Sequence, residues 1–95
     1  MVTKSIINDC VNEIFNGLSS EDKLVICTHL ASALDKNENN NLFVETIETK
    51  KGIKKGIKLG VKNKKDDSTK ISFRTKIYNP DALIHCAIMI QNCNK

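Results

Sequence analysis

A glycine at every fourth position constrains the middle of this 95-residue chain more than any other feature. Three tandem tetrapeptides occupy residues 51–62, with the sequences KGIK, KGIK and LGVK. In a helix, each of their glycines would cost about 1 kcal/mol relative to alanine. In a strand, the apolar residues share one face, and the glycines share the other face with the lysine that ends each tetrapeptide. The repeat therefore predicts a strand that begins near residue 53 or 57, with glycines that mark a bulge or a close approach of another backbone.

Before the repeat, apolar residues recur at the spacing of one helix face. Residues 3–16 predict an amphipathic helix whose apolar face is made of Ile6, Ile7, Cys10, Val11, Ile14 and Phe15. Ser19 or Ser20 then caps a second helix that ends near Asp35 and has acidic residues in its first turn. We expect this helix to bury Leu24, Cys27, Leu30, Ala31 and Leu34.

Two further segments are rich in β-forming residues. Residues 42–49 predict a strand with Phe43 and Ile47 as its apolar positions. Residues 70–78 alternate between an apolar face, made of Ile71, Phe73 and Ile77, and a basic or polar face. Turn-forming residues at 63–68 connect this segment to the repeat, so the two predict a β-hairpin.

The sequence Asn79-Pro80-Asp81 is typical of a helix start, with asparagine as the cap and proline at the first helical position. The helix that follows, to about Gln91, is apolar on nearly all sides and should be buried on several of them. Because the chain is short and has only four aromatic residues, its own core is thin, and we expect a homodimer. The predicted fold class is α+β in a single domain, residues 1–95. It comprises a helical pair at 1–36, a three-stranded antiparallel sheet with a basic β-hairpin at 42–78, and an apolar C-terminal helix at 80–91.

The charge of +4 is distributed unevenly along the chain. Residues 1–49 contain eight acidic and three basic residues, whereas residues 50–95 contain twelve basic and three acidic ones. Such segregation favours a polyanionic partner for the C-terminal half. Nine hairpin residues are candidate contacts to nucleic acid: Lys54, Lys55, Lys58, Lys62, Lys64, Lys65, Lys70, Arg74 and Lys76.

A two-stranded basic ribbon can follow phosphates and enter the major groove, so duplex DNA is the favoured ligand. Lysine lacks the planar fork that reads guanine, and we therefore expect binding that tolerates any sequence. Two alternatives stay open. The basic face is simply solvated, in a chain whose coding bias favours lysine, or the protein is an adaptor or inhibitor that binds a partner through its lysines or its acidic half.

The four cysteines form no CxxC motif and match no common zinc-ligand spacing, so we expect buried thiols, no metal and no cofactor. Thiols without a disulfide framework indicate an intracellular, reducing compartment such as the cytoplasm, nucleoid or nucleus. No nucleophile motif or phosphate-binding loop is present, which predicts a protein without enzymatic activity. We expect neither a signal peptide nor a membrane-spanning segment.

The segment Ile77-Tyr-Asn-Pro-Asp-Ala-Leu83 is similar to the start of the last helix in the bacterial histone-like HU/IHF family, and the predicted element order resembles that family as well. The resemblance implies an intertwined dimer that binds DNA with a β-arm. The family's Gly-Phe-Gly turn and the Arg-Asn-Pro sequence of its arm tip are absent here. Pro80 is the only proline, so an arm of this chain would not kink DNA by inserting one.

Overall fold

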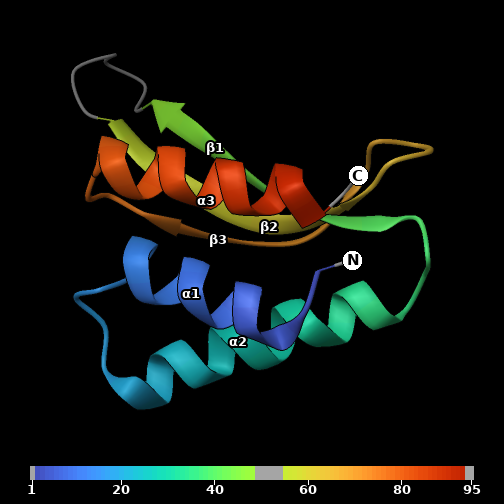
Figure 1. The fold of residues 1–95 in the computed structure, drawn as a ribbon, viewed down its shortest axis with the longest axis horizontal. Coiled ribbons are helices and arrows are strands. Elements are labelled where there is room, and N and C mark those ends of the chain that lie inside the picture. The colour runs from blue at the N-terminus through green and yellow to red at the C-terminus, as the bar shows by residue number, and fades with distance from the viewer. Residues whose placement is uncertain (1, 49–54, 94–95) are drawn as a thin grey trace.

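Three helices pack on one side of an antiparallel sheet in the computed structural model, which describes residues 2–48 and 55–93 (Figure 1). The described elements are, in chain order, α1 (Lys4–Ile14), α2 (Ser20–Asp35), β1 (Asn40–Glu48), β2 (Lys55–Asn63), β3 (Thr69–Thr75) and α3 (Pro80–Cys93). In Figure 1, α1 lies between α3 and α2, and it contacts both. The predicted α+β class is confirmed, including the three-stranded antiparallel sheet and the C-terminal helix.

Each helix begins at a side chain that satisfies an unpaired backbone N–H of the first turn. Thr3 Oγ1 accepts a hydrogen bond from the amide of Ile6 at 3.4 Å. Ser19 Oγ caps α2 in the same way at 3.2 Å, and Asn79 Oδ1 caps α3 at 3.2 Å. The caps predicted at residues 19 and 79 are therefore present.

The central strand is β2, which pairs with β1 along its whole described length and with β3 on its other edge. The register places Phe43 opposite Gly60, and Glu45 opposite Lys58. A register shift interrupts the pairing of β2 with β3 between Val61 and Lys62. A Cβ atom at Gly60 would overlap the carbonyl oxygen of Ile71, so the glycine allows a close approach of β3, as the repeat predicts.

One hydrophobic cluster unites the helices and the inner face of the sheet. The sheet contributes Leu42, Ile57, Leu59 and Val61, each at most 2% exposed. The helices contribute Ile7, Cys10, Val11, Ile14, Phe15, Ile26, Leu30, Ala33, Ala82, Cys86 and Ile90. All described helices therefore share a single core with the sheet.

The buried sides of α2 and β1 differ from those predicted. Leu24 is 66% exposed, and Ile26, Leu30 and Ala33 form the buried side of α2. This rotation follows from contacts of α2 with both α1 and the sheet. In β1, Leu42 is buried in the core. Phe43 points to the opposite face of the sheet, together with Asn41 and Glu45.

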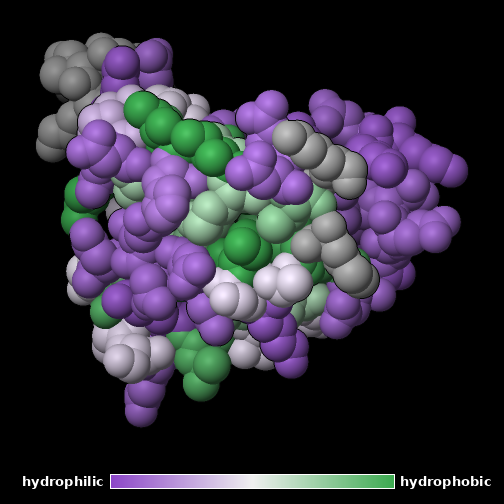
Figure 2. Space-filling model, viewed as in Figure 1, coloured by the Kyte–Doolittle hydropathy of each residue, from purple (hydrophilic) through white to green (hydrophobic). Residues whose placement is uncertain are grey.

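The segment after β3 and the last helix leave apolar surface exposed. The strand ends at Thr75, so Ile77 is 61% exposed rather than packed in the sheet. Helix α3 buries one side, but Ile84 and Ile88 are 56% and 51% exposed. Figure 2 shows apolar side chains in a strip over α3. In the single chain this side of α3 is therefore exposed, and the expected burial on several sides stays a prediction that requires a second subunit.

Candidate nucleic-acid interface

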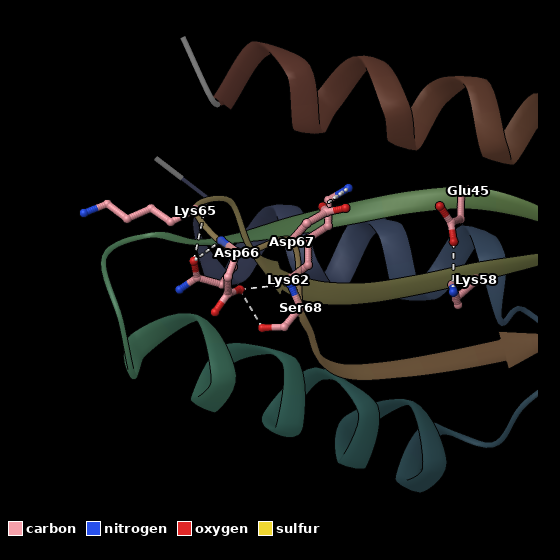
Figure 3. A network of polar contacts seen from close by, with 8 residues as sticks. Glu45, Lys58, Lys62, Lys65, Asp66, Asp67 and Ser68 are labelled. Carbon is pink, nitrogen blue, oxygen red and sulfur yellow. Dashed lines mark hydrogen bonds and ion pairs between the residues drawn. The ribbon is translucent and has the colours of Figure 1, made fainter.

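The sheet has an outer face, opposite the helices. We define it by every second residue of each strand, ten positions in all: Asn41, Phe43, Glu45, Ile47, Gly56, Lys58, Gly60, Lys62, Ser72 and Arg74. Figure 3 looks toward the sheet with α3 and α2 on either side of the strands, and no helix crosses in front of Glu45 and Lys58. Within the described residues, this face is therefore the uncovered side of the sheet.

Lys58 lies at the centre of the outer face and is held by its neighbours. Its Nζ atom lies 2.9 Å from Glu45 Oε1 on β1 (Figure 3), and its side chain is only 18% exposed. The same ammonium lies 5.7 Å from the centroid of the Phe43 ring. Its alkyl chain therefore covers apolar surface while its charge is paired, an ordinary role for a lysine on a sheet.

Lys62 is more accessible than Lys58. Its ammonium lies 3.5 Å from Asp67 Oδ1 and 5.3 Å from the centroid of the Phe43 ring, and its side chain is 40% exposed. Asp67 has a φ of 59°, the left-handed conformation that allows the tight turn after β2. An ion pair this exposed contributes at most about 1 kcal/mol, so a phosphate can compete with Asp67 for Lys62.

The turn between β2 and β3 is short and internally bonded (Figure 3). Asn63 Oδ1 accepts hydrogen bonds from the amides of Lys65 and Asp66 at 2.9 and 3.4 Å. The hydroxyl and the amide of Ser68 donate to Asp66 Oδ1, and these bonds lower the pKa of the Asp66 carboxyl. Lys64 and Lys65 are exposed at this fixed tip, which is a turn of residues 64–68 and not an extended arm.

The remaining predicted contacts are distributed around this centre. Arg74 is exposed and lies directly opposite Lys58. Lys70 borders a cavity beside α2, and Lys76 is exposed after the end of β3. Lys55 is one of the β2 residues on the inner side of the sheet, and its Nζ atom lies 5.7 Å from the centroid of the Tyr78 ring. The ninth candidate, Lys54, lies outside the described residues.

The sequence-based prediction overlooked three residues that shape the outer face. Phe43 was expected on the apolar side of its strand. It lies two residues from Glu45, so the two side chains point to the same face of the sheet, and this spacing could have been seen in the sequence. Glu45 and Asp67 neutralise two of the lysines, although no acidic residue occurs between residues 50 and 65. Their pairing depends on the strand register and the turn, which local sequence does not reveal.

Cys10, Cys86 and His85 lie close together on the helices α1 and α3. Cys86 is fully buried, with its Sγ atom 3.9 Å from the carbonyl oxygen of Cys10. A side-chain hydrogen bond with Cys10, together with burial, raises the pKa of its thiol. His85 Nδ1 lies 2.7 Å from both carboxylate oxygens of Glu13. Among the described residues, no group of three or more His, Cys, Asp or Glu side chains is placed to hold a metal ion. The raised pKa of Cys86 disfavours the thiolate that nucleophilic catalysis uses.

No protein-family model, curated protein or solved structure matches this chain. The resemblance to the HU/IHF family accordingly stays a prediction. In the described part of the chain, no helix is both long and apolar enough to cross a bilayer.

Proposed function

We propose that this protein binds nucleic acid without catalysing a reaction, and that it contacts the phosphate backbone through the outer face and the β2–β3 turn. The observation that carries the proposal is an uncovered sheet face that presents Lys62 and Arg74 next to the exposed Lys64 and Lys65. Lysine-rich surfaces of this kind bind phosphates with little preference for sequence.

The distribution of acidic residues supports this orientation. The first two helices carry Asp9, Glu13, Glu21, Asp22 and Asp35, and both pack on the inner side of the sheet. A polyanion that approaches the outer face therefore lies on the other side of the sheet from these helices. The two sides of the molecule differ in charge, which favours one orientation of encounter.

The geometry favours contact with a broad face over insertion into a groove. The hairpin was expected to act as a two-stranded ribbon, but β2 is the central strand and is paired on both edges. Its lysines therefore lie on a three-stranded platform backed by helices. Such a platform can lie along a backbone, and Lys64 and Lys65 at the turn extend the row of cations.

A salt titration of affinity tests this proposal. The variant Lys64→Gln/Lys65→Gln/Arg74→Gln removes three exposed cations and no side chain of the core. If each of them neutralises a phosphate, the slope of log affinity against log salt for duplex DNA should flatten by about two to three units. Fluorescence anisotropy with labelled oligonucleotides measures this slope.

The matched control removes the same charge from the helix side, in the variant Lys4→Gln/Lys23→Gln/Lys36→Gln. We expect its slope to equal that of the wild type. Equal effects of the two triple variants would mean that net charge alone controls binding. Absence of salt-dependent binding by the wild type at low ionic strength would refute the proposed function.

The exposed strip on α3 favours a second candidate, in which the protein binds another protein. Ile84 and Ile88 lie one turn apart on this strip and are both more than half exposed. We propose that a second copy of the chain covers them, since the short chain has a thin core of its own. The variant Ile84→Lys/Ile88→Lys should then be a monomer by light scattering under conditions where the wild type is a dimer; a monomeric wild type would contradict this.

We also propose a reducing, intracellular location. Cys10, Cys27 and Cys86 are free thiols, and burial raises the pKa of Cys27. Thiols that are not paired in disulfides are common in reducing compartments.

A further inference from the structure

The ring of Phe43 lies on the uncovered side of the sheet and is not part of the hydrophobic core. Phe43 is partly exposed and pairs in register with Gly60 of the central strand. A Cβ atom at Gly60 would come within 3.0 Å of Phe43 Cε1, so the ring rests against the main chain at the glycine. The missing side chain of Gly60 makes the space that the ring occupies.

Two ammonium groups from the central strand lie over this ring. The Nζ atoms of Lys58 and Lys62 lie 5.7 and 5.3 Å from its centroid. These lysines are the second neighbours of Gly60 on either side, and they point to the same face of the sheet. An aromatic ring on an open face, next to a lysine whose exposed ion pair a phosphate can displace, combines the two features that single-stranded nucleic acids require, a stacking surface and a contact to the backbone.

We propose that Phe43 stacks on an unpaired base, and that the outer face therefore prefers single-stranded nucleic acid to duplex. This inference rests on the proposed function, because the same lysines supply the phosphate contacts. In a duplex, the faces of the bases are stacked on one another and do not reach the ring, so only the phosphates contribute. In a single strand, one base can take the place of the Lys62 ammonium over Phe43, and that ammonium can pair with an adjacent phosphate instead of Asp67.

Binding of three oligonucleotides separates stacking from charge. The probes are a thymidine 20-mer, a single strand of equal length with abasic sites throughout, and a 20-base-pair duplex. The abasic strand keeps the phosphates and removes every base. We expect the wild type to bind the thymidine strand about tenfold more tightly than the abasic strand at the same salt concentration, a typical effect of one stacked base.

Variants of Phe43 assign this difference to the ring. Phe43→Leu keeps an apolar side chain of similar volume and should bind both single strands equally. Phe43→Tyr keeps the ring and should retain the wild-type preference. The wild type should bind the duplex less tightly than the thymidine strand at the same salt concentration, because no base of the duplex reaches the ring. A thermal unfolding midpoint close to that of the wild type confirms that each variant is folded.

The outcomes distinguish this inference from the proposed function. Equal binding of the thymidine and abasic strands by the wild type overturns the role of Phe43, whether or not the variants fold. If Phe43→Leu keeps the preference, a different residue stacks the base and the inference is wrong. In both cases, salt-dependent binding that weakens in the Lys64/Lys65/Arg74 variant leaves the proposed function intact. No binding of any probe overturns both.

Discussion

Substitution of Gly60 by alanine tests whether the approach of β3 to β2 is as close as the structure shows. The added methyl group would overlap the carbonyl oxygen of Ile71 and would lie 2.9 Å from Ser72 Cβ and 3.0 Å from Phe43 Cε1. The aromatic ring can move, but the Ile71 carbonyl belongs to the backbone of the neighbouring strand. The strands must therefore separate locally to admit a single methyl group.

The expected cost follows from two opposing effects. Overpacking of a tight site destabilises a protein by about 1–3 kcal/mol. Alanine also reduces the entropy of the unfolded chain, which returns about 0.4–1 kcal/mol. Because the main overlap is with the backbone, we expect a net loss of about 2 kcal/mol in the free energy of unfolding. For a domain of this size, that loss lowers Tm by roughly 8–16 °C.

Gly17 provides the matched control for this experiment. A Cβ atom at Gly17 would have no neighbour within 4 Å, so alanine there should leave stability unchanged or raise it by a few tenths of a kcal/mol. Urea unfolding followed by circular dichroism measures both variants. If Gly60→Ala is as stable as Gly17→Ala, the close approach of the strands does not exist and the position of the Phe43 ring loses its support.

Two further predictions concern titrating groups. In the native protein at pH 8, iodoacetamide should leave Cys10 and Cys86 unmodified, because both are fully buried. A hydrogen bond with Cys10, together with burial, also raises the pKa of Cys86. Rapid modification without denaturant, detected by peptide mass spectrometry, would contradict this. Hydrogen bonds from Ser68 lower the pKa of Asp66, so the stabilisation by its carboxylate is present above its ordinary pKa near 4 and is lost as the pH falls through the lowered value. The difference in unfolding midpoint between the wild type and Asp66→Asn should therefore shrink from about pH 5 to pH 2, and a constant difference would argue against it.

Local sequence signals predicted the elements well because their causes are local. The cap at Ser19 and the Asn79-Pro80 start depend on side chains within three residues of the amides they serve. The strand in the glycine repeat was predicted for a similar reason, since three glycines disfavour a helix wherever the segment lies.

The faces of the elements were harder to predict because they depend on distant partners. Leu24 fits a helical apolar stripe, yet the packing of α2 against α1 and the sheet selects Ile26 and leaves Leu24 exposed. The neutralisation of Lys58 by Glu45 requires the register of β1 against β2, across thirteen residues of sequence. The charge of this face was therefore overestimated from the sequence, while the shared side of Lys58, Lys62 and Arg74 was predicted from the period of the strands.

The tetrapeptide repeat connects the core to the candidate site. Four residues are two full periods of a strand, so each repeat position always points to the same side of the sheet. The first position is Lys55 at the exposed end of β2 but Leu59 where the strand enters the core, which shows how one changed position adapts the repeat to burial. On the other side, Lys58 and Lys62 are four residues apart, about 13 Å along the strand, with Gly60 midway between them. Without a side chain at Gly60, the ring from the adjacent strand fills this gap, and the repeat thus generates both the buried apolar face and the spacing of cations around an aromatic surface.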